Sequence, residues 1–124
     1  MRLSSSLVLI LLTPLCLVAQ TTEQIRVVES IGGRVRKVTG GLELSFNLGK
    51  RSIRDQDLEV ISQVKNVCVL NLKRTKISDA GLVLIGRMVT LRRLHLELTN
   101  VTDQGLAHLS GLKNLEYLNL YGTG

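Results

Sequence analysis

The chain has 124 residues, which is enough for one domain built around a single hydrophobic core. Its 16 basic and 10 acidic residues give a formal net charge of +6, a balance that would suit an anionic partner. The two cysteines are too few for a disulfide-rich scaffold. The basic residues lack both the interleaved aromatic residues and the motifs typical of nucleic-acid binding, which argues against a nucleic-acid partner.

The first segment has the pattern of a secretory signal peptide. Arg2 and a run of serines precede an apolar stretch, residues 7–18, and Ala19 stands before polar residues. This stretch is shorter than the roughly 20 residues that a membrane span needs. We therefore predict a signal peptide over residues 1–19 and no transmembrane span in the mature chain. The protein would be exported to the periplasm, the cell envelope or the extracellular space; Cys16 leaves a lipoprotein as one alternative, and an uncleaved anchor is another.

Residues 20–41 are predicted to form an N-terminal cap, which starts with a short helix. Thr21 and Gln24 fit a helix capping box, and Gly32-Gly33 would end the helix after about ten residues. Three apolar residues fall on one face of this helix: Ile25, Val28 and Ile31.

A β-hairpin is predicted to follow the helix. Residues 34–39 and 42–48 alternate in polarity on either side of Gly40-Gly41, which is the usual composition of a hairpin turn. The first strand completes the cap, because its basic side chains would give the cap a polar outer face: Arg34, Arg36 and Lys37.

A leucine pattern then repeats every 24 residues. Residues 91–96 and 115–120 share the pattern L-x-x-L-x-L, and residues 67–72 carry it with valine in first place. A weaker copy one step earlier aligns Phe46 with Leu70. Side chains alternate between the two faces of a strand, so each copy predicts a short strand that buries its leucines. A fixed period of about 20 to 29 residues is typical of a solenoid.

The second part of each copy predicts a short helix. Residues 75–82 and 99–106 share the pattern T-x-[IV]-[ST]-D-x-G-L. The hydroxyls of Ser78 and Thr102 would cap the helix, and the following aspartate suits its positive end. The glycines are expected to allow close backbone approach: Gly81 and Gly105. The earliest copy has other residues at the hydroxyl and glycine positions, so we expect its helix to be the least regular: Arg54 and Asp57.

These motifs resemble the leucine-rich repeat family over residues 42–124. The second motif is similar to the repeats of secreted bacterial proteins and to those of F-box substrate adaptors. The resemblance implies an α/β solenoid of three units and the start of a fourth, with parallel strands on the concave side and short helices on the convex side. Threonines replace the usual turn asparagine, and their hydroxyls are expected to bond turn backbone: Thr75, Thr99 and Thr123.

The pattern stops at Gly124, within a fourth unit. A leucine-rich sheet edge left open there would invite pairing with another chain. We expect a fragment of a longer array, and the alternative is a protomer that self-associates through this C-terminal edge.

Outward-facing strand positions would form rows on the concave face, one of which joins Ser45, Val69, Arg93 and Tyr117. Tyrosine and arginine are common anchors of interfaces. We therefore predict non-catalytic recognition of an unknown protein or a surface glycan through this face. Its candidate residues are Asn71, Lys73, Arg93, His95, Glu97, Tyr117, Asn119 and Tyr121. An ordinary solvated polar face is the alternative interpretation.

Two other functions are compatible with the sequence. Basic residues in the first three units could bind an anionic polymer or envelope surface: Lys50, Arg51, Arg54, Lys73, Arg74, Lys76, Arg92 and Arg93. An intracellular adaptor array would follow if the N-terminal segment were not a signal.

Catalysis has little support in the sequence. His95 and His108 have no visible acid or nucleophile partner, and the recurring aspartates are explained by capping. We therefore predict no catalytic residue, no cofactor and no metal site. Cys68, the only cysteine of the mature chain, is interpreted as a small apolar filler rather than an exposed thiol.

Overall fold

The computed structural model describes the backbone of residues 14–124 and the side chains from residue 21 onward. This range is a mixed α/β fold with one five-stranded sheet, whose strands lie in the order β1-β2-β3-β4-β5. The strands are β1 (Arg34–Val38), β2 (Gly41–Ser45), β3 (Val67–Asn71), β4 (Arg93–His95) and β5 (Tyr117–Asn119). Strands β1 and β2 are antiparallel, and all other neighbouring strands are parallel.

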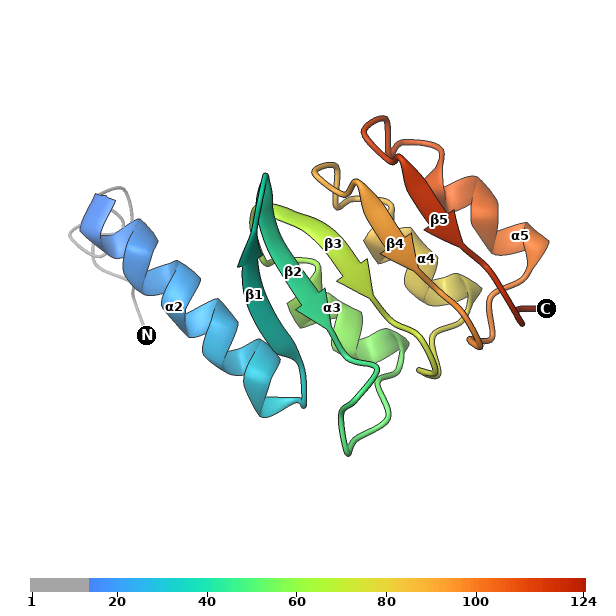
Figure 1. The fold of residues 1–124 in the computed structure, drawn as a ribbon, viewed down its shortest axis with the longest axis horizontal. Coiled ribbons are helices and arrows are strands. Elements are labelled where there is room, and N and C mark those ends of the chain that lie inside the picture. The colour runs from blue at the N-terminus through green and yellow to red at the C-terminus, as the bar shows by residue number, and fades with distance from the viewer. Residues whose placement is uncertain (1–13) are drawn as a thin grey trace, which may run out of the picture.

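Helices cover one face of the sheet and one of its ends. They are α2 (Pro14–Ser30), α3 (Leu58–Ile61), α4 (Asp79–Ile85) and α5 (Asp103–Leu106), with 3-10 turns η1 (Asp55–Asp57) before α3 and η2 (Ala107–Leu109) after α5. Figure 1 shows α3, α4 and α5 side by side behind the sheet, whereas α2 lies beyond β1. Residues 1–13 of the predicted signal peptide lie outside the described residues, so its cleavage stays a prediction.

Helix α2 is longer than the sequence predicted. It covers 17 residues and begins at Pro14, so the predicted start at a Thr21 capping box is wrong. Proline suits the first turn of a helix, and the residues that follow it up to Thr21 contain no glycine that would interrupt one. The helix ends where it was predicted to end, because Gly32 adopts a φ of 93° there.

The predicted hairpin is confirmed, although its turn is Thr39-Gly40 rather than Gly40-Gly41 and its second strand is shorter than expected. Arg34 pairs with Ser45 and Val38 pairs with Gly41 across the turn. Strand β2 ends at Ser45, and Leu48, which was expected in the strand, is 67% exposed.

The parallel strands keep the 24-residue step from β3 onward. Leu70 pairs with Leu94, which pairs with Leu118. One step earlier the partner of Leu70 is Leu44, so the predicted alignment of Phe46 with Leu70 is wrong. The segment that joins β2 to Ile53 is two residues longer than the corresponding segment after β3, and it shifts the whole of β2 against the sequence period.

The core lies between the sheet and helices α3, α4 and α5. Large apolar side chains from strands, helices and the segments that connect them meet there and lose essentially all contact with water. The fully buried ones are Leu44, Ile53, Leu58, Ile61, Leu70, Leu72, Ile77, Leu82, Ile85, Leu91, Leu94 and Leu96.

The predicted hydroxyl caps are replaced by bonds between successive helices. Neither Ser78 nor Thr102 caps its own helix. Instead, the backbone N–H and the hydroxyl of Ser78 donate to the Asp55 carboxylate at 2.8 and 2.5 Å. Thr102 donates in the same way to Asp79, at 2.7 and 2.5 Å. An ionised carboxylate is the stronger acceptor, and it draws these donors across 23 residues of sequence.

These bonds explain the glycine that follows each aspartate of the sequence motif. A Cβ at Gly105 would lie 2.2 Å from Asp79 Oδ1, and one at Gly81 would lie 2.5 Å from Asp55 Oδ1. The predicted close approach is therefore confirmed, and the group that approaches is a carboxylate.

The first helical segment has a cap of its own kind. Arg54 N–H donates to Asp57 Oδ2 at 2.9 Å, and Arg51 Nη2 donates to the other carboxylate oxygen at 2.8 Å. Asp57 is only 7% exposed. It therefore accepts the Arg54 N–H as Asp55 and Asp79 accept those of Ser78 and Thr102, and the segment begins with a 3-10 turn rather than an α-helical one.

Two smaller predictions are confirmed. The turn threonines donate their hydroxyls to the carbonyl three residues earlier, at 2.6 to 2.9 Å: Thr75 to Leu72, Thr99 to Leu96 and Thr123 to Leu120. Cys68 is buried, with 3% of its surface exposed, and acts as core filler.

The last strand lies at the edge of the sheet. Strand β5 pairs only with β4 within the described part of the chain, and Leu118 is 38% exposed where its partner Leu94 is fully buried. None of the helices in residues 14–124 is both long and apolar enough to cross a membrane.

Candidate functional site

The sheet face opposite α3, α4 and α5, which we call the open face, carries two rows of outward side chains. One row runs across all five strands as Arg34, Ser45, Asn71, His95 and Asn119, and the next as Arg36, Glu43, Val69, Arg93 and Tyr117. The predicted pairing of outward residues into rows is confirmed from β3 to β5. The predicted neighbours Ser45 and Val69 are not paired, because the longer segment after β2 shifts Ser45 opposite Asn71.

Five of the predicted face residues form a connected group on β4, just after β4, and on β5. We call Arg93, His95, Glu97, Tyr117 and Asn119 the Tyr117 cluster. Arg93 Cζ lies 5.3 Å from the centre of the Tyr117 ring, and the His95 ring lies 5.0 Å from it at 43°. Asn119 Nδ2 donates to the tyrosine hydroxyl at 3.1 Å. These are favourable cation–π and tilted ring contacts, so the aromatic ring is held in place.

Glu97 forms the base of the Tyr117 cluster. Its Oε1 accepts a hydrogen bond from Asn119 Nδ2 at 2.9 Å, and His95 Nδ1 lies 3.3 Å from the same oxygen. The prediction that His95 has no acid partner is therefore wrong. Residues two apart on a strand face the same way, and this spacing was the sequence signal that could have indicated the pair.

The second oxygen of Glu97 is the unusual atom of the cluster. The Glu97 side chain is 10% exposed, and its Oε2 is buried without any hydrogen-bond partner among the described residues. Buried polar atoms in proteins almost always have a partner, so an exception needs a reason.

The other three predicted face residues lie outside this cluster. Asn71 Oδ1 accepts the backbone N–H of Lys73 at 3.1 Å, and Asn119 Oδ1 accepts that of Tyr121 at the same distance. Tyr121 is 76% exposed. Within residues 21–124 the side chains of Lys73 and Tyr121 form no hydrogen bond or ion pair, so the structure does not join them to the cluster.

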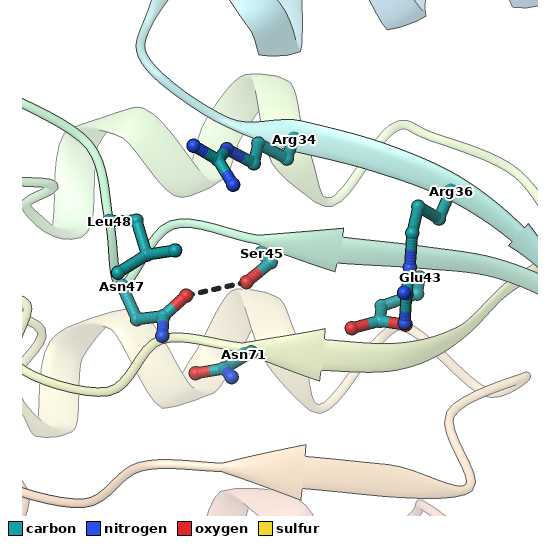
Figure 2. Close-up of a pocket in the computed structure, with 7 residues that line it drawn as sticks. All are labelled: Arg34, Arg36, Glu43, Ser45, Asn47, Leu48 and Asn71. Atoms are coloured by element: carbon teal, nitrogen blue, oxygen red, sulfur yellow. Dashed lines mark hydrogen bonds and ion pairs between the residues drawn. The ribbon is translucent and has the colours of Figure 1, made fainter.

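A pocket opens at the other end of the open face, over β1, β2 and β3 (Figure 2). We call it the Arg34 pocket. It has a volume of about 300 Å³ and is lined by Arg34, Arg36, Glu43, Ser45, Asn47, Leu48 and Asn71. Figure 2 shows Arg36 beside Glu43 at one end, while Arg34 extends toward the other end, where Asn47 and Leu48 lie.

The charges of the Arg34 pocket do not cancel. Arg36 donates to Glu43 at 2.5 Å, and this hydrogen bond, together with the negative charge of Glu43, raises the pKa of Arg36. Arg34 has no ion-pair partner in the part of the chain that the structure describes. The pocket therefore keeps one uncompensated positive charge.

The two amides of the Arg34 pocket are oriented by hydrogen bonds to their oxygens. Ser45 Oγ donates to Asn47 Oδ1 at 2.6 Å, and the backbone N–H of Lys73 donates to Asn71 Oδ1. Each amide oxygen thus accepts one hydrogen bond, which orients the side chain and leaves its NH2 group free to donate. The pocket therefore offers these NH2 groups and the Arg34 guanidinium as hydrogen-bond donors.

Most of this pocket was not predicted from the sequence. Asn71 was a candidate binding residue and Ser45 was predicted on the same face, whereas Arg34 and Arg36 were assigned to a polar outer surface of the cap. The structure sets Arg34 opposite Ser45 and Arg36 opposite Glu43 because the two-residue turn is Thr39-Gly40. The predicted turn at Gly40-Gly41 would have set Arg34 opposite Asn47, so the sequence pattern did not indicate this pairing.

Two of the eight basic residues considered for polyanion binding form ion pairs within the described part of the chain. Arg51 bonds to Asp57, and Arg92 bonds to Glu116 through Nε and Nη2 at 3.1 and 2.7 Å. These pairs reduce the positive charge that the predicted stripe could present to a polymer. No group of three or more His, Cys, Asp or Glu side chains among the described residues could hold a metal ion.

Comparison with known proteins adds no relative to this description. No protein-family model matches the chain, and no curated protein matches it. The site is therefore interpreted from its own chemistry.

Proposed function

We propose that the chain is a leucine-rich repeat module of an exported protein, that it binds another protein or a surface glycan through the open face, and that it has no catalytic activity. The parallel pairing of β3, β4 and β5 at a constant 24-residue step supports the repeat assignment. The position of three short helices on one face supports it as well.

Glu97 is the observation that carries the binding proposal. A carboxylate that is buried with one unpaired oxygen destabilises the fold, by about 1 to 3 kcal/mol. Proteins keep such unfavourable groups mainly where function requires them. Glu97 is linked through Asn119 to Tyr117, against whose ring Arg93 lies, and tyrosine and arginine are residue types that anchor interfaces. An N–H or O–H group of a partner that reached this cluster would complete the hydrogen bonding of Glu97.

The size of the open face limits the kind of ligand. Strands about 4.8 Å apart, with few outward residues each, give a patch of only a few hundred Å². A standard protein interface takes about 800 Å² from each partner. The described face is therefore suited to a short peptide segment or an oligosaccharide rather than to a whole folded surface.

Selection from defined libraries tests the proposal. The full chain is screened against a random twelve-residue peptide library and against a glycan array, and each recovered ligand is measured by calorimetry. Tyr117→Ala should weaken binding by about tenfold or more, because it removes the centre of the cluster. Arg87→Ala, an exposed arginine on the helical side, is the matched control and should change affinity less than twofold. Ligands that bind Tyr117→Ala and Arg93→Ala as tightly as the natural chain would refute the proposal.

A further inference from the structure

We infer that the Arg34 pocket binds the carboxylate of an aspartate or glutamate side chain on a partner peptide laid across the open face. The inference rests on the proposed function, and it adds the chemical class of the ligand and the place where its charge is held.

Charge gives the first argument. Arg36 is occupied by Glu43, whereas Arg34 lines the same pocket with no carboxylate of this chain to pair with among the described residues. Arginine presents several N–H groups in a planar fork that matches the two oxygens of a carboxylate. An anionic group entering the pocket would meet one free guanidinium and no free acid.

Hydrogen bonding gives the second argument. The oxygens of Asn47 and Asn71 are held by Ser45 Oγ and by the Lys73 backbone, so both NH2 groups remain available. A carboxylate accepts hydrogen bonds and cannot donate them, which matches the Arg34 guanidinium and the two NH2 groups, while the one carboxylate of the lining, Glu43, is paired with Arg36. A cationic or strongly donating ligand would leave these groups unpaired.

The residues that line the pocket favour a peptide over an acidic sugar. No aromatic side chain lines the Arg34 pocket, and its only apolar lining residue is Leu48, which is 67% exposed. An extended peptide could place an acidic side chain at Arg34 and lay a neighbouring apolar side chain against Leu48.

The row geometry sets the length of such a peptide. Arg34 on β1 and Asn119 on β5 are the two ends of one row, four strand spacings apart. At about 4.8 Å per spacing and about 3.3 Å per extended residue, a peptide needs roughly six residues to reach from the pocket to the Tyr117 cluster. We therefore expect bound peptides to carry an acidic residue about six positions from the group that contacts Tyr117.

Nuclear magnetic resonance of the nitrogen-15-labelled full chain tests the inference with three small probes. These are a blocked Gly-Glu-Gly tripeptide, the matched Gly-Gln-Gly tripeptide and glucuronic acid. The side-chain NH2 signals of Asn47 and Asn71 should shift in a saturable manner with Gly-Glu-Gly. The affinity for Gly-Gln-Gly, measured from the same signals, should be at least tenfold weaker.

Variants of one strand identify the charge responsible. Arg34→Gln should weaken binding of Gly-Glu-Gly at least tenfold, and Arg34→Lys should retain part of it. Lys37→Gln removes the same charge from the same strand but lies outside the pocket lining, so it should bind as the natural chain does.

Three results would overturn the inference: Gly-Gln-Gly bound as well as Gly-Glu-Gly, no dependence on Arg34, or tighter binding of glucuronate than of the acidic tripeptide. The last would assign the pocket to an acidic glycan. The proposed function is judged separately, by library ligands that depend on Tyr117. Such ligands can survive a failure at Arg34, so the two failures are distinguishable.

Discussion

The two ends of the open face use asparagine in opposite ways. In the Arg34 pocket, Asn47 and Asn71 have their oxygens occupied and their NH2 groups free. In the Tyr117 cluster, the NH2 group of Asn119 is used internally by Glu97 and Tyr117. One end therefore offers donors to a ligand, and the other is a nearly closed network with one unpaired acceptor. Similar residues on one sheet thus give two sites of different polarity.

The support beneath the two ends also differs. Leu44, beneath the pocket, is fully buried, whereas Leu118, on the edge strand of the cluster, is 38% exposed. Both belong to one ladder of paired residues, so the difference comes from having a neighbouring strand on each side or on only one. The pocket end should be the more rigidly supported of the two.

Truncation of these leucines should give the largest effect and is the most direct way to break the comparison. Leu44→Ala should lower the free energy of unfolding by about 2 to 5 kcal/mol, because it leaves a cavity in the core. Leu118→Ala should cost about 1 kcal/mol, since part of its surface is already in water. Chemical denaturation measures both. Equal losses would mean that the two ends are equally supported.

Removal of the Asp57 carboxylate should give the next largest effect. Asp57 and Glu97 are each 7% exposed, but both oxygens of Asp57 have partners. Asp57→Ala should cost about 1 to 3 kcal/mol by thermal or chemical unfolding, because the Arg54 N–H loses its acceptor and the half-exposed Arg51 is left unpaired. No measurable loss would show that the capping bond contributes little.

Glu97→Gln should instead raise the free energy of unfolding, which sharpens the contrast between Glu97 and Asp57. It removes a buried charge with an unpaired oxygen while keeping an acceptor for Asn119, so we expect a gain of about 1 kcal/mol in unfolding free energy. Ligand binding by the Tyr117 cluster should weaken in the same variant. A destabilised Glu97→Gln protein would assign Glu97 a purely structural role.

The smallest effect is expected for Asp79→Asn, on the helical side between α4 and α5. Hydrogen bonds from the hydroxyl and then the N–H of Thr102 lower the pKa of Asp79 from its usual 3.8. The ionised carboxylate therefore stabilises the fold above that usual value, and the contribution is lost as pH falls through the lowered folded-state pKa. The natural chain should exceed the variant in stability at neutral pH and lose that advantage below about pH 3.8. A difference that persisted unchanged in acid would contradict this assignment.

Much of the fold could be predicted from spacing alone. The 24-residue step predicted the partners of Leu70, Leu94 and Leu118, and the glycine pair predicted the hairpin but placed its turn one residue too late. The 24-residue step does not hold at β2, because the segment after Ser45 contains two additional residues. An alignment of apolar residues of similar spacing does not reveal such an insertion. The helix caps were misassigned for a different reason, since a local capping rule cannot detect an acceptor 23 residues away.

The candidate site was predicted only where the step holds. Arg93, His95, Glu97, Tyr117 and Asn119 were selected as outward positions, and the structure brings them together. The Arg34 pocket depends on an antiparallel pair beside a shifted parallel one, which no single period describes. The unpaired oxygen of Glu97 was also beyond sequence analysis, because burial of one side-chain atom depends on all of its neighbours.

The bonds from Ser78 to Asp55 and from Thr102 to Asp79 tie each helical segment to the next one along the stack. Opening of either segment breaks the bond for both, so local opening of one segment should raise the hydrogen-exchange rate of its neighbour. The helical side should therefore open in adjacent pairs of segments rather than one segment at a time.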